Sequence, residues 1–369
     1  MSFVKPLENS ILKTLAYFDI LNFPLTLEEL FRYLWQPPWL GYEEFAAWVG
    51  NPPSRGAHGG CKTSASSIWP PHTGLTPPTA TPLEGGFGCR DGFYFLTGRE
   101  NLIAERQRAA EITAQKLTKA HRAVKFIRSV PFLKAIFVCN SVGAGMAKPE
   151  SDIDFFIVTE KNRIWIVRFF TNLVLRCLGL RTYGSHQRDR ICLSFYVDAA
   201  HLDLAPWRVV DDDIHFAYWL NMMKPLYDPE NYYEKFVLAN TWVEKYVPNV
   251  QAVLDSTMAA NHPSPLLGKE GITSASPPAR GGVGLAGRGG GSVGHLWKRA
   301  WEAMWRGSYG NVVENEAKKL QLTKMAFSLK EKAKLGDNGV VVQDGIIKLH
   351  ENDARKIMRE KWLEKIKVL

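Results

Sequence analysis

The stretch from residue 130 to residue 197 constrains the fold of this chain more than any other part of it. Apolar runs over 135–139, 152–159 and 191–197 predict three strands, and Ile164 to Leu178 has the apolar spacing of a helix. Strand, loop, strand, helix and strand in this order, with short connections, are typical of an α/β domain. We therefore expect a mixed sheet with flanking helices at the centre of the chain.

The loop between the first two of these strands carries the most distinctive residue pattern. The first strand runs into an Asn140-Ser141 turn of small residues, and ten residues then separate Ser141 from Asp152-Ile-Asp154, which opens the next strand. Residues i and i+2 of a strand point to one face, so the two carboxylates are predicted to lie side by side. Neighbouring carboxylates repel each other unless a cation joins them, and hard oxygen ligands suit Mg²⁺. The N–H groups and the hydroxyl of the Asn140-Ser141 turn suit a phosphate.

This pattern resembles the signature of the nucleotidyltransferase superfamily, the fold of DNA polymerase beta, in which a Gly-Ser turn is followed by an acidic-x-acidic strand. The resemblance implies transfer of a nucleoside monophosphate from a nucleoside triphosphate to an acceptor hydroxyl that the sequence does not identify. It also implies that Mg²⁺ is held by the catalytic residues Asp152 and Asp154, and that nucleotide is contacted by Asn140, Ser141 and Ser151.

Two positions depart from the family pattern. Asn140 stands where the family has glycine, although asparagine tolerates a left-handed backbone better than most residues. The family also places a third carboxylate on the next strand, where the inward polar residue of this chain is Ser194. Asp198, farther along the same predicted face, is the alternative third position, and Asp189 is a weaker one. The sequence thus predicts a metal site but leaves the catalytic base open.

Two segments rich in glycine and proline interrupt the chain. Residues 51–90 hold seven Pro and seven Gly, and residues 261–294 hold four Pro and ten Gly. Neither segment has the period of a strand or a helix, so we interpret both as insertions or linkers without packed elements. The remaining chain is divided into a module over 1–98, a nucleotidyltransferase-like domain with a helical cap over 99–250, and a helix-hairpin-helix region over 295–369.

The module over 1–98 is predicted to be winged-helix-like, because three short helices precede a strand pair. A capping box at Thr26-Leu-Glu-Glu29 marks the start of the second helix, and the insertion would lie in the wing hairpin. The presumed third helix, Tyr42 to Val49, is acidic and has no Lys or Arg with which to read DNA, so we favour a structural or protein-contact role. A second capping box, Thr97-Gly-Arg-Glu100, is predicted to start a long helix.

The cap of the central domain is predicted to be helical from Phe216 to Tyr246. The three acids of Asp211-Asp-Asp213 resemble a metal-binding run, but acids in a first turn stabilise the helix dipole. We therefore interpret them as a helix cap.

Composition is consistent with a globular cytoplasmic protein that has a polyanionic partner. Forty-six Lys and Arg against 37 Asp and Glu give a net charge of +9, which suits a nucleoside triphosphate or nucleic acid. The chain lacks a signal-peptide pattern and any uninterrupted apolar run of about 18 residues, so we expect no membrane partner. Five scattered cysteines without a CxxC pair argue against a disulfide framework or a zinc site.

Three functional hypotheses follow from the sequence. The first is a Mg²⁺-dependent nucleotidyltransferase. The second is a catalytically weak or inactive relative that binds nucleotide or nucleic acid for regulation, which the missing third acid favours. The third is a winged-helix nucleic-acid-binding protein whose α/β domain acts as a sensor.

Overall fold

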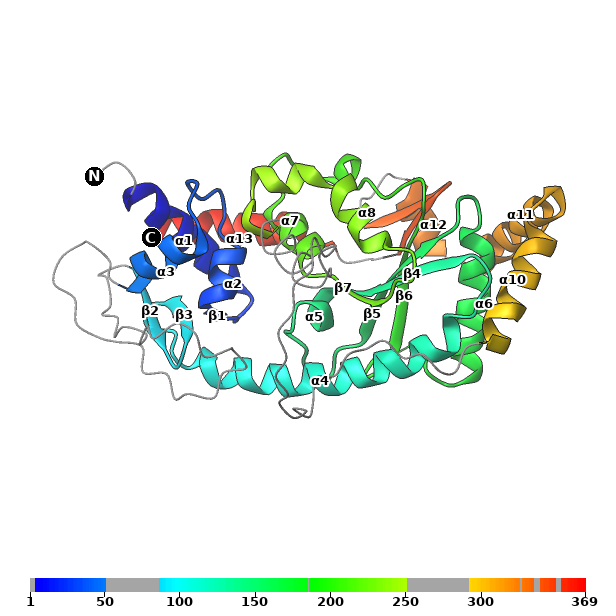
Figure 1. Ribbon diagram of the computed structural model, residues 1–369, viewed down its shortest axis with the longest axis horizontal. Helices are drawn as coiled ribbons and strands as arrows, with labels where there is room; N and C mark the ends of the chain where they lie inside the picture. Colours follow the sequence, from blue (N-terminus) through cyan, green and yellow to red (C-terminus); the bar gives the residue numbers. More distant parts are fainter. Residues whose placement is uncertain are drawn as a thin grey trace, which may run out of the picture.

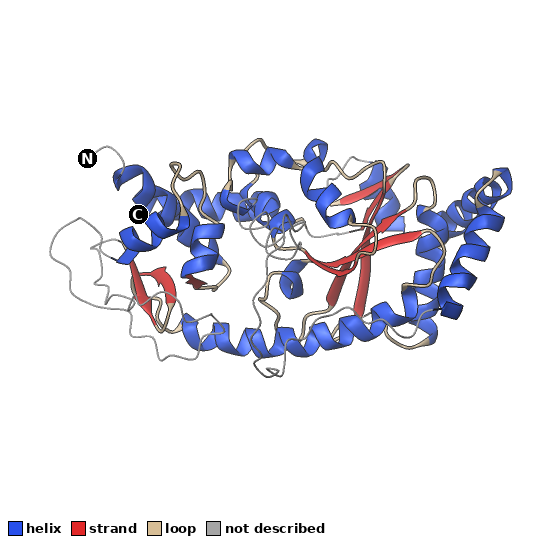
Figure 2. Cartoon of the chain, in the orientation of Figure 1, coloured by secondary structure: helices blue, strands red, loops and turns tan. Residues whose placement is uncertain are grey.

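The computed structural model describes residues 4–50, 86–184, 186–250, 292–325, 327–334, 339–349 and 353–369. It is a mixed α/β structure with two sheets, one of three strands and one of six (Figure 1, Figure 2). The small sheet and the first helices lie at one end of the molecule, and the large sheet lies towards the other. One long helix, α4 (Leu102–Ile127), runs along both parts.

The N-terminal module contains the three predicted helices and the strand pair that follows them, together with a two-residue strand between the first two helices that was not predicted. They are α1 (Val4–Ile20), β1 (Leu25–Thr26), α2 (Leu27–Arg32), α3 (Tyr42–Gly50), β2 (Phe87–Arg90) and β3 (Phe93–Leu96). The strands form an antiparallel sheet in the order β1-β3-β2. The predicted capping box of α2 is confirmed: the Glu29 N–H donates to Thr26 Oγ1 at 3.2 Å, and the Thr26 N–H donates to Glu29 Oε2 at 3.0 Å.

The first glycine- and proline-rich segment enters the chain at a different place from the one predicted. The β2–β3 hairpin turns tightly at Asp91-Gly92, where both residues have positive φ, as a two-residue hairpin turn requires. The segment therefore lies between α3 and β2 and not in the hairpin. Residues 51–85 are outside the described residues, and residues 87–90 form a paired strand that the composition of the segment concealed.

One further local prediction fails in the same region. The Thr97 hydroxyl donates to the Gly86 carbonyl at 3.0 Å and caps no helix, and α4 begins only at Leu102. Cys89 is disulfide-bonded, whereas Cys139, Cys177 and Cys192 carry free thiols. The sequence pattern argues against a framework of several disulfides, and one bonded cysteine among the described residues does not contradict that prediction.

The large sheet has the strand order β7-β4-β5-β6-β9-β8. Its strands are β4 (Leu133–Val138), β5 (Ile153–Thr159), β6 (Ile191–Asp198), β7 (Lys224–Tyr227), β8 (Val340–Gln343) and β9 (Ile346–Leu349). β5 and β6 are parallel, and all other neighbours are antiparallel. The predicted strands over 135–139, 152–159 and 191–197 are thus confirmed to within two residues at either end.

The region predicted to be a helical cap contains an extra strand. The helices α7 (Ile214–Asn221) and α8 (Tyr232–Ala239) are separated by β7, which pairs with β4. β7 contains Pro225, which an edge strand tolerates because one side of its backbone needs no partner. The capping interpretation of Asp213 is confirmed, since its carboxylate accepts the Phe216 N–H at 3.1 Å.

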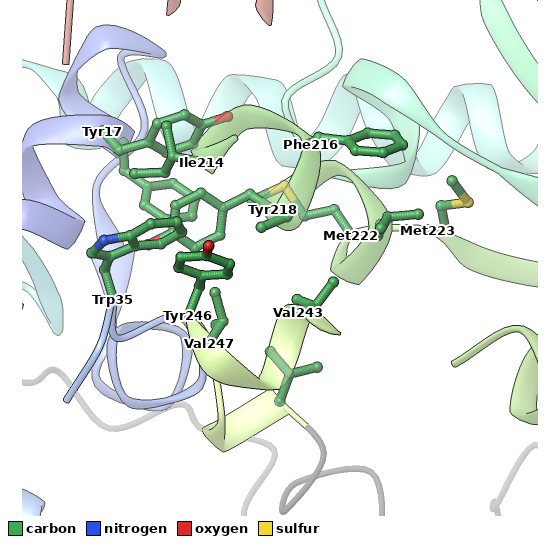
Figure 3. Close-up of a cluster of buried hydrophobic side chains, with 14 of the residues drawn as sticks. Tyr17, Trp35, Ile214, Phe216, Tyr218, Met222, Met223, Val243, Tyr246 and Val247 are labelled. Carbon is green, nitrogen blue, oxygen red and sulfur yellow. The ribbon is translucent and has the colours of Figure 1, made fainter. Parts of the chain in front are cut away.

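The large sheet is buried on both faces. One face carries Ile136, Phe155 and Tyr196 and packs against α4 and α6 (Ile164–Cys177), with Trp305 of α10 in the same core. The opposite face carries Phe137, Phe156 and Phe195 and packs against α7 and α8. The second core continues without a break into the N-terminal module, where Tyr17 and Trp35 meet Tyr218 and Tyr246 (Figure 3).

The C-terminal residues are distributed over three places in the molecule. The first helix of the predicted helix-hairpin-helix region is interrupted and is replaced by α10 (Ser292–Trp305), α11 (Ser308–Thr323) and α12 (Phe327–Lys334). β8 and β9 extend the large sheet, and α13 (Arg355–Val368) returns to the N-terminal module. There the Trp362 indole donates to the Lys13 carbonyl at 2.9 Å, and Arg359 forms an ion pair with Asp212. Among the described helices, none has the length and apolarity needed to cross a membrane.

Candidate cation and phosphate site

The turn after β4 has the backbone that the sequence predicts. Asn140 has φ +52°, in the left-handed region that asparagine tolerates, and starts the short helix α5 (Asn140–Gly143). The Asn140 carboxamide oxygen accepts the Trp219 indole N–H at 2.6 Å, so this side chain ties the turn to α7. Gly143 is required by close packing, because a Cβ at this position would lie 2.7 Å from the Val138 carbonyl oxygen. The half-buried Ser141 lies on this turn.

The two aspartates of the Asp-x-Asp pattern share a face, as predicted. Asp154 lies in β5 and is 5% exposed, and Asp152 directly precedes the strand and is half-buried. The structure adds a third group, the thiol of Cys192 in β6. One carboxylate oxygen from each aspartate and the Cys192 Sγ all lie within 4.8 Å of one another. We call these three residues the DDC cluster.

The register of the parallel strands brings Cys192 to the cluster. Asp154 pairs with Cys192, whereas Phe156, two residues later in β5, pairs with Phe195, three residues later in β6. β6 therefore contains one extra residue, a bulge, between these two pairs. Cys192 lies directly beside Asp154, and Ser194 lies within the bulge, where its side chain is hydrogen-bonded to the Cys192 thiol.

The bulge also removes Asp198 from the predicted face. Beyond it, Phe195 and Val197 enter one core and Tyr196 the other, so Asp198 shares its face with Tyr196. Asp198 pairs with Thr159, five residues from Asp154, which corresponds to about 16 Å along the strand. Its carboxylate accepts hydrogen bonds from the Asn162 and Ala200 N–H groups and contacts His201 Nδ1 at 2.7 Å. The alternative third position at Asp198 is therefore wrong.

Asp189 and Ser151 lie on the loops that lead into the cluster. Asp189 forms ion pairs with Lys116 at 2.8 Å and with Lys119 at 2.7 Å, which occupies both of its carboxylate oxygens. The Ser151 hydroxyl donates to the Lys148 carbonyl within its own loop. Both residues thus support the loops, and the predicted contact of Ser151 with nucleotide stays a prediction.

The electrostatic setting keeps the cysteine protonated. Burial raises the pKa of Cys192, the nearby carboxylates Asp154 and Asp152 raise it further, and the hydrogen bond with Ser194 lowers it only in part. Burial likewise raises the pKa of Cys139, which lies on the other side of Asp154. A cation that coordinates sulfur, such as Zn²⁺, would reverse this balance for Cys192, because a coordinated thiol loses its proton, whereas Mg²⁺ prefers the oxygens of Asp152 and Asp154.

The cluster offers two hard oxygen ligands and one softer sulfur ligand for a single cation, and the turn of α5 lies in the connection that leads from β4 into β5. Such a set leaves coordination positions for water or phosphate oxygens. Within the described part of the chain, no third carboxylate joins Asp152 and Asp154. The sequence analysis missed Cys192 because the register between β5 and β6 cannot be predicted from the sequence of either strand alone. The one sequence feature that pointed to Cys192 was its position two residues before Ser194, on the same predicted face.

In comparisons with known proteins, no protein-family model, no curated protein and no solved structure matches the chain.

Proposed function

We propose that this protein binds a nucleoside triphosphate together with a divalent cation and transfers the nucleoside monophosphate to an acceptor hydroxyl. The observation that carries the proposal is the DDC cluster, which gathers two adjacent carboxylates at the start of a strand beside a small-residue turn. The arrangement of the two carboxylates and the turn, and their spacing in the sequence, support the resemblance to nucleotidyltransferases. The cation expected from that resemblance is Mg²⁺.

In this proposal each part of the site has a separate task. Asp152 and Asp154 hold the cation, and the Ser141 hydroxyl with the N–H groups of its turn binds phosphate oxygens. When bound, the cation neutralises the charge that develops around the α-phosphate during in-line attack. The acceptor hydroxyl releases its proton to water as its oxygen forms a bond to the α-phosphorus, the bond to the bridging oxygen of the β-phosphate breaks, and pyrophosphate leaves.

A second candidate function is nucleotide binding without transfer. It is favoured by the residue at the position where nucleotidyltransferases have a third carboxylate. Here Cys192 lies beside Asp154, and among the described residues no third carboxylate joins the cluster to activate the acceptor hydroxyl. In this case the protein would bind nucleotide and cation as a regulatory ligand. A transfer assay separates the two functions, because both predict binding and only the first predicts product.

For the N-terminal module we propose a winged-helix-like fold that contacts protein. The order of its elements and the sheet order β1-β3-β2 support the fold. Helix α3, at the position of a recognition helix, begins with Glu43 and Glu44 and has no basic residue. DNA binding, the third hypothesis, would require another surface of the module.

The experiment for the site compares Asp152→Asn and Asp154→Asn with the matched control Asp211→Asn. Asp211 has a 99% exposed side chain at the start of the cap and lies outside the DDC cluster. We expect each cluster variant to lose Mg²⁺-dependent nucleotide binding in isothermal titration while the control retains wild-type affinity. Transfer of radiolabelled nucleotide is then measured with the wild type. Unchanged affinity in the double cluster variant would exclude this site.

A further inference from the structure

Lys116 is a buried cation at the entrance to the two strands that carry the DDC cluster. It lies in the middle of α4, and its side chain is 1% exposed. Its ammonium group donates to the Ser151 carbonyl at 2.7 Å, to the Pro149 carbonyl at 3.3 Å and to Asp189 Oδ1 at 2.8 Å. A lysine has three N–H donors, so every donor has an acceptor and the charge is balanced by Asp189.

The acceptors of Lys116 belong to both loops that lead into the cluster. Ser151 directly precedes Asp152, and Asp189 precedes Cys192 by three residues. The two loops also meet each other, because the Asp189 N–H donates to the Ser151 carbonyl at 3.2 Å. That carbonyl therefore accepts two hydrogen bonds, one from the neighbouring loop and one from Lys116. The ammonium group links α4, the start of β5 and the start of β6 at one point.

Neighbouring residues of α4 hold the same loops less directly. One turn before Lys116, Thr113 Oγ1 accepts the Ala147 N–H at 3.3 Å, which fixes the loop at an earlier point. One turn after it, Lys119 forms an ion pair with the second oxygen of Asp189, and its side chain is 45% exposed. Among the hydrogen bonds of the described residues, none joins Lys119 to residues 149–151. Lys116 differs from both because it is buried and bridges the two loops.

We propose that Lys116 is a positioning residue that sets the separation of Asp152 and Cys192 and thereby the cation affinity of the DDC cluster. The inference rests on the proposed function, since it assigns Lys116 a role in the same cation site. Groups behind metal ligands change metal affinity by about 10- to 100-fold when they are removed. Without the ammonium group, the Ser151 carbonyl keeps only the Asp189 N–H, Asp189 keeps Lys119, and the contact between the loop carrying Asp152 and the loop leading to Cys192 weakens.

The test measures the Mn²⁺ affinity of the full-length protein by electron paramagnetic resonance, with Lys116→Met as the variant. Methionine preserves the length of the apolar stem and removes the ammonium group. Lys119→Met controls for the loss of a cation near Asp189. Ile127→Ala controls for stability, because Ile127 is fully buried in the same helix, 11 residues and about 16 Å farther along α4.

We expect Lys116→Met to weaken Mn²⁺ binding by about 10-fold or more, in line with other groups behind metal ligands. The Mn²⁺ affinity of both control variants should stay within about twofold of that of the wild type, even if Ile127→Ala lowers the melting temperature as much as Lys116→Met does. The proposal is overturned if folded Lys116→Met binds Mn²⁺ like the wild type, or if Ile127→Ala loses as much affinity.

A wild-type protein that binds no Mn²⁺ would refute the cation site of the proposed function, and the role of Lys116 is then decided by hydrogen exchange. The Asp189 N–H and the Ile153 N–H, which donates to the Arg190 carbonyl at 2.8 Å, report the contact between the two loops. Lys116→Met should accelerate exchange at these two amides relative to Phe156, and Ile127→Ala should not. Equal protection in both variants would show that Lys116 does not hold the loops.

Discussion

Replacement of Cys192 by aspartate tests whether residue 192 occupies the position of a third cation ligand in the DDC cluster. In the wild type, a neutral thiol lies within 4.8 Å of a carboxylate oxygen from Asp152 and from Asp154. The substitution Cys192→Asp adds a third negative charge to this cluster. Two unit charges at that distance repel by about 3.5 kcal/mol at an effective dielectric constant of about 20.

Protonation limits the cost of this repulsion. Keeping one carboxyl group protonated at pH 7, about three units above its ordinary pKa, costs about 4 kcal/mol. Without a divalent cation we therefore expect Cys192→Asp to have a free energy of unfolding about 3–4 kcal/mol below that of Cys192→Ser, which removes the thiol without adding charge. Because protonation relieves the repulsion, the difference should shrink as the pH falls towards 4.

The assay is urea denaturation of both variants in EDTA and in saturating Mg²⁺. Mg²⁺ should remove most of the difference, because three carboxylates at this spacing bind the cation more strongly than two. Equal stability of the two variants in EDTA would show that position 192 does not face the aspartates. Equal stabilisation of both by Mg²⁺ would show that the cation binds elsewhere.

Two further substitutions test the turn and the contact between the module and the cap. Gly143→Ala places a Cβ 2.7 Å from the Val138 carbonyl and should lower the free energy of unfolding in urea by about 1–3 kcal/mol, whereas Gly41→Ala, with no atom within 4 Å of its Cβ, should change it little. Burial lowers the pKa of His215, which contacts the Tyr17 hydroxyl, from 6.5 to about 4, so the unfolded chain binds more protons between these values. Stability should therefore fall by up to about 3 kcal/mol from pH 6.5 to pH 4, and His215→Gln should abolish this part of the pH dependence.

The strands around the site were predictable because their signals are local. β4, β5 and β6 are mainly apolar, and Asp152 and Asp154 share a face through the two-residue period of a strand. The left-handed Asn140 was also predictable, because the pattern requires a tight turn and asparagine permits that backbone. These features depend on few residues that are close in sequence.

The third ligand was not predictable, because it depends on how two strands are aligned. The bulge near Ser194 changes which side chains of β6 share a face, so simple alternation placed Asp198 on the wrong side. β7 was hidden for a similar reason, since Pro225 reads as a breaker unless the strand is known to lie at an edge. Strand pairing and register are properties of the folded sheet and cannot be predicted from the sequence of one strand alone.

The N-terminal module and the α/β part share one hydrophobic core, and this determines how the functional hypotheses can be separated. Arg106 of α4 donates to Glu29 of the module at 2.7 Å and to the Gly145 carbonyl, in the connection between α5 and β5, at 3.2 Å, and it lies 3.8 Å from the centre of the Phe23 ring. The module also shares a hydrophobic core with α7 and receives α13 from the opposite end of the chain.

Removing the module would therefore remove Glu29 and Phe23, which contact Arg106, uncover the aromatic core and leave α13 without its neighbour. A truncated chain that fails to bind nucleotide would report loss of folding and not the location of the site. Single substitutions in the full chain avoid this difficulty, because Asp152 and Asp154 lie at the start of β5 whereas Glu43 and Glu44 lie in α3 of the module. A variant of α3 that keeps nucleotide binding, and a variant of the DDC cluster that keeps partner binding, would assign the two activities to separate parts of one folded unit.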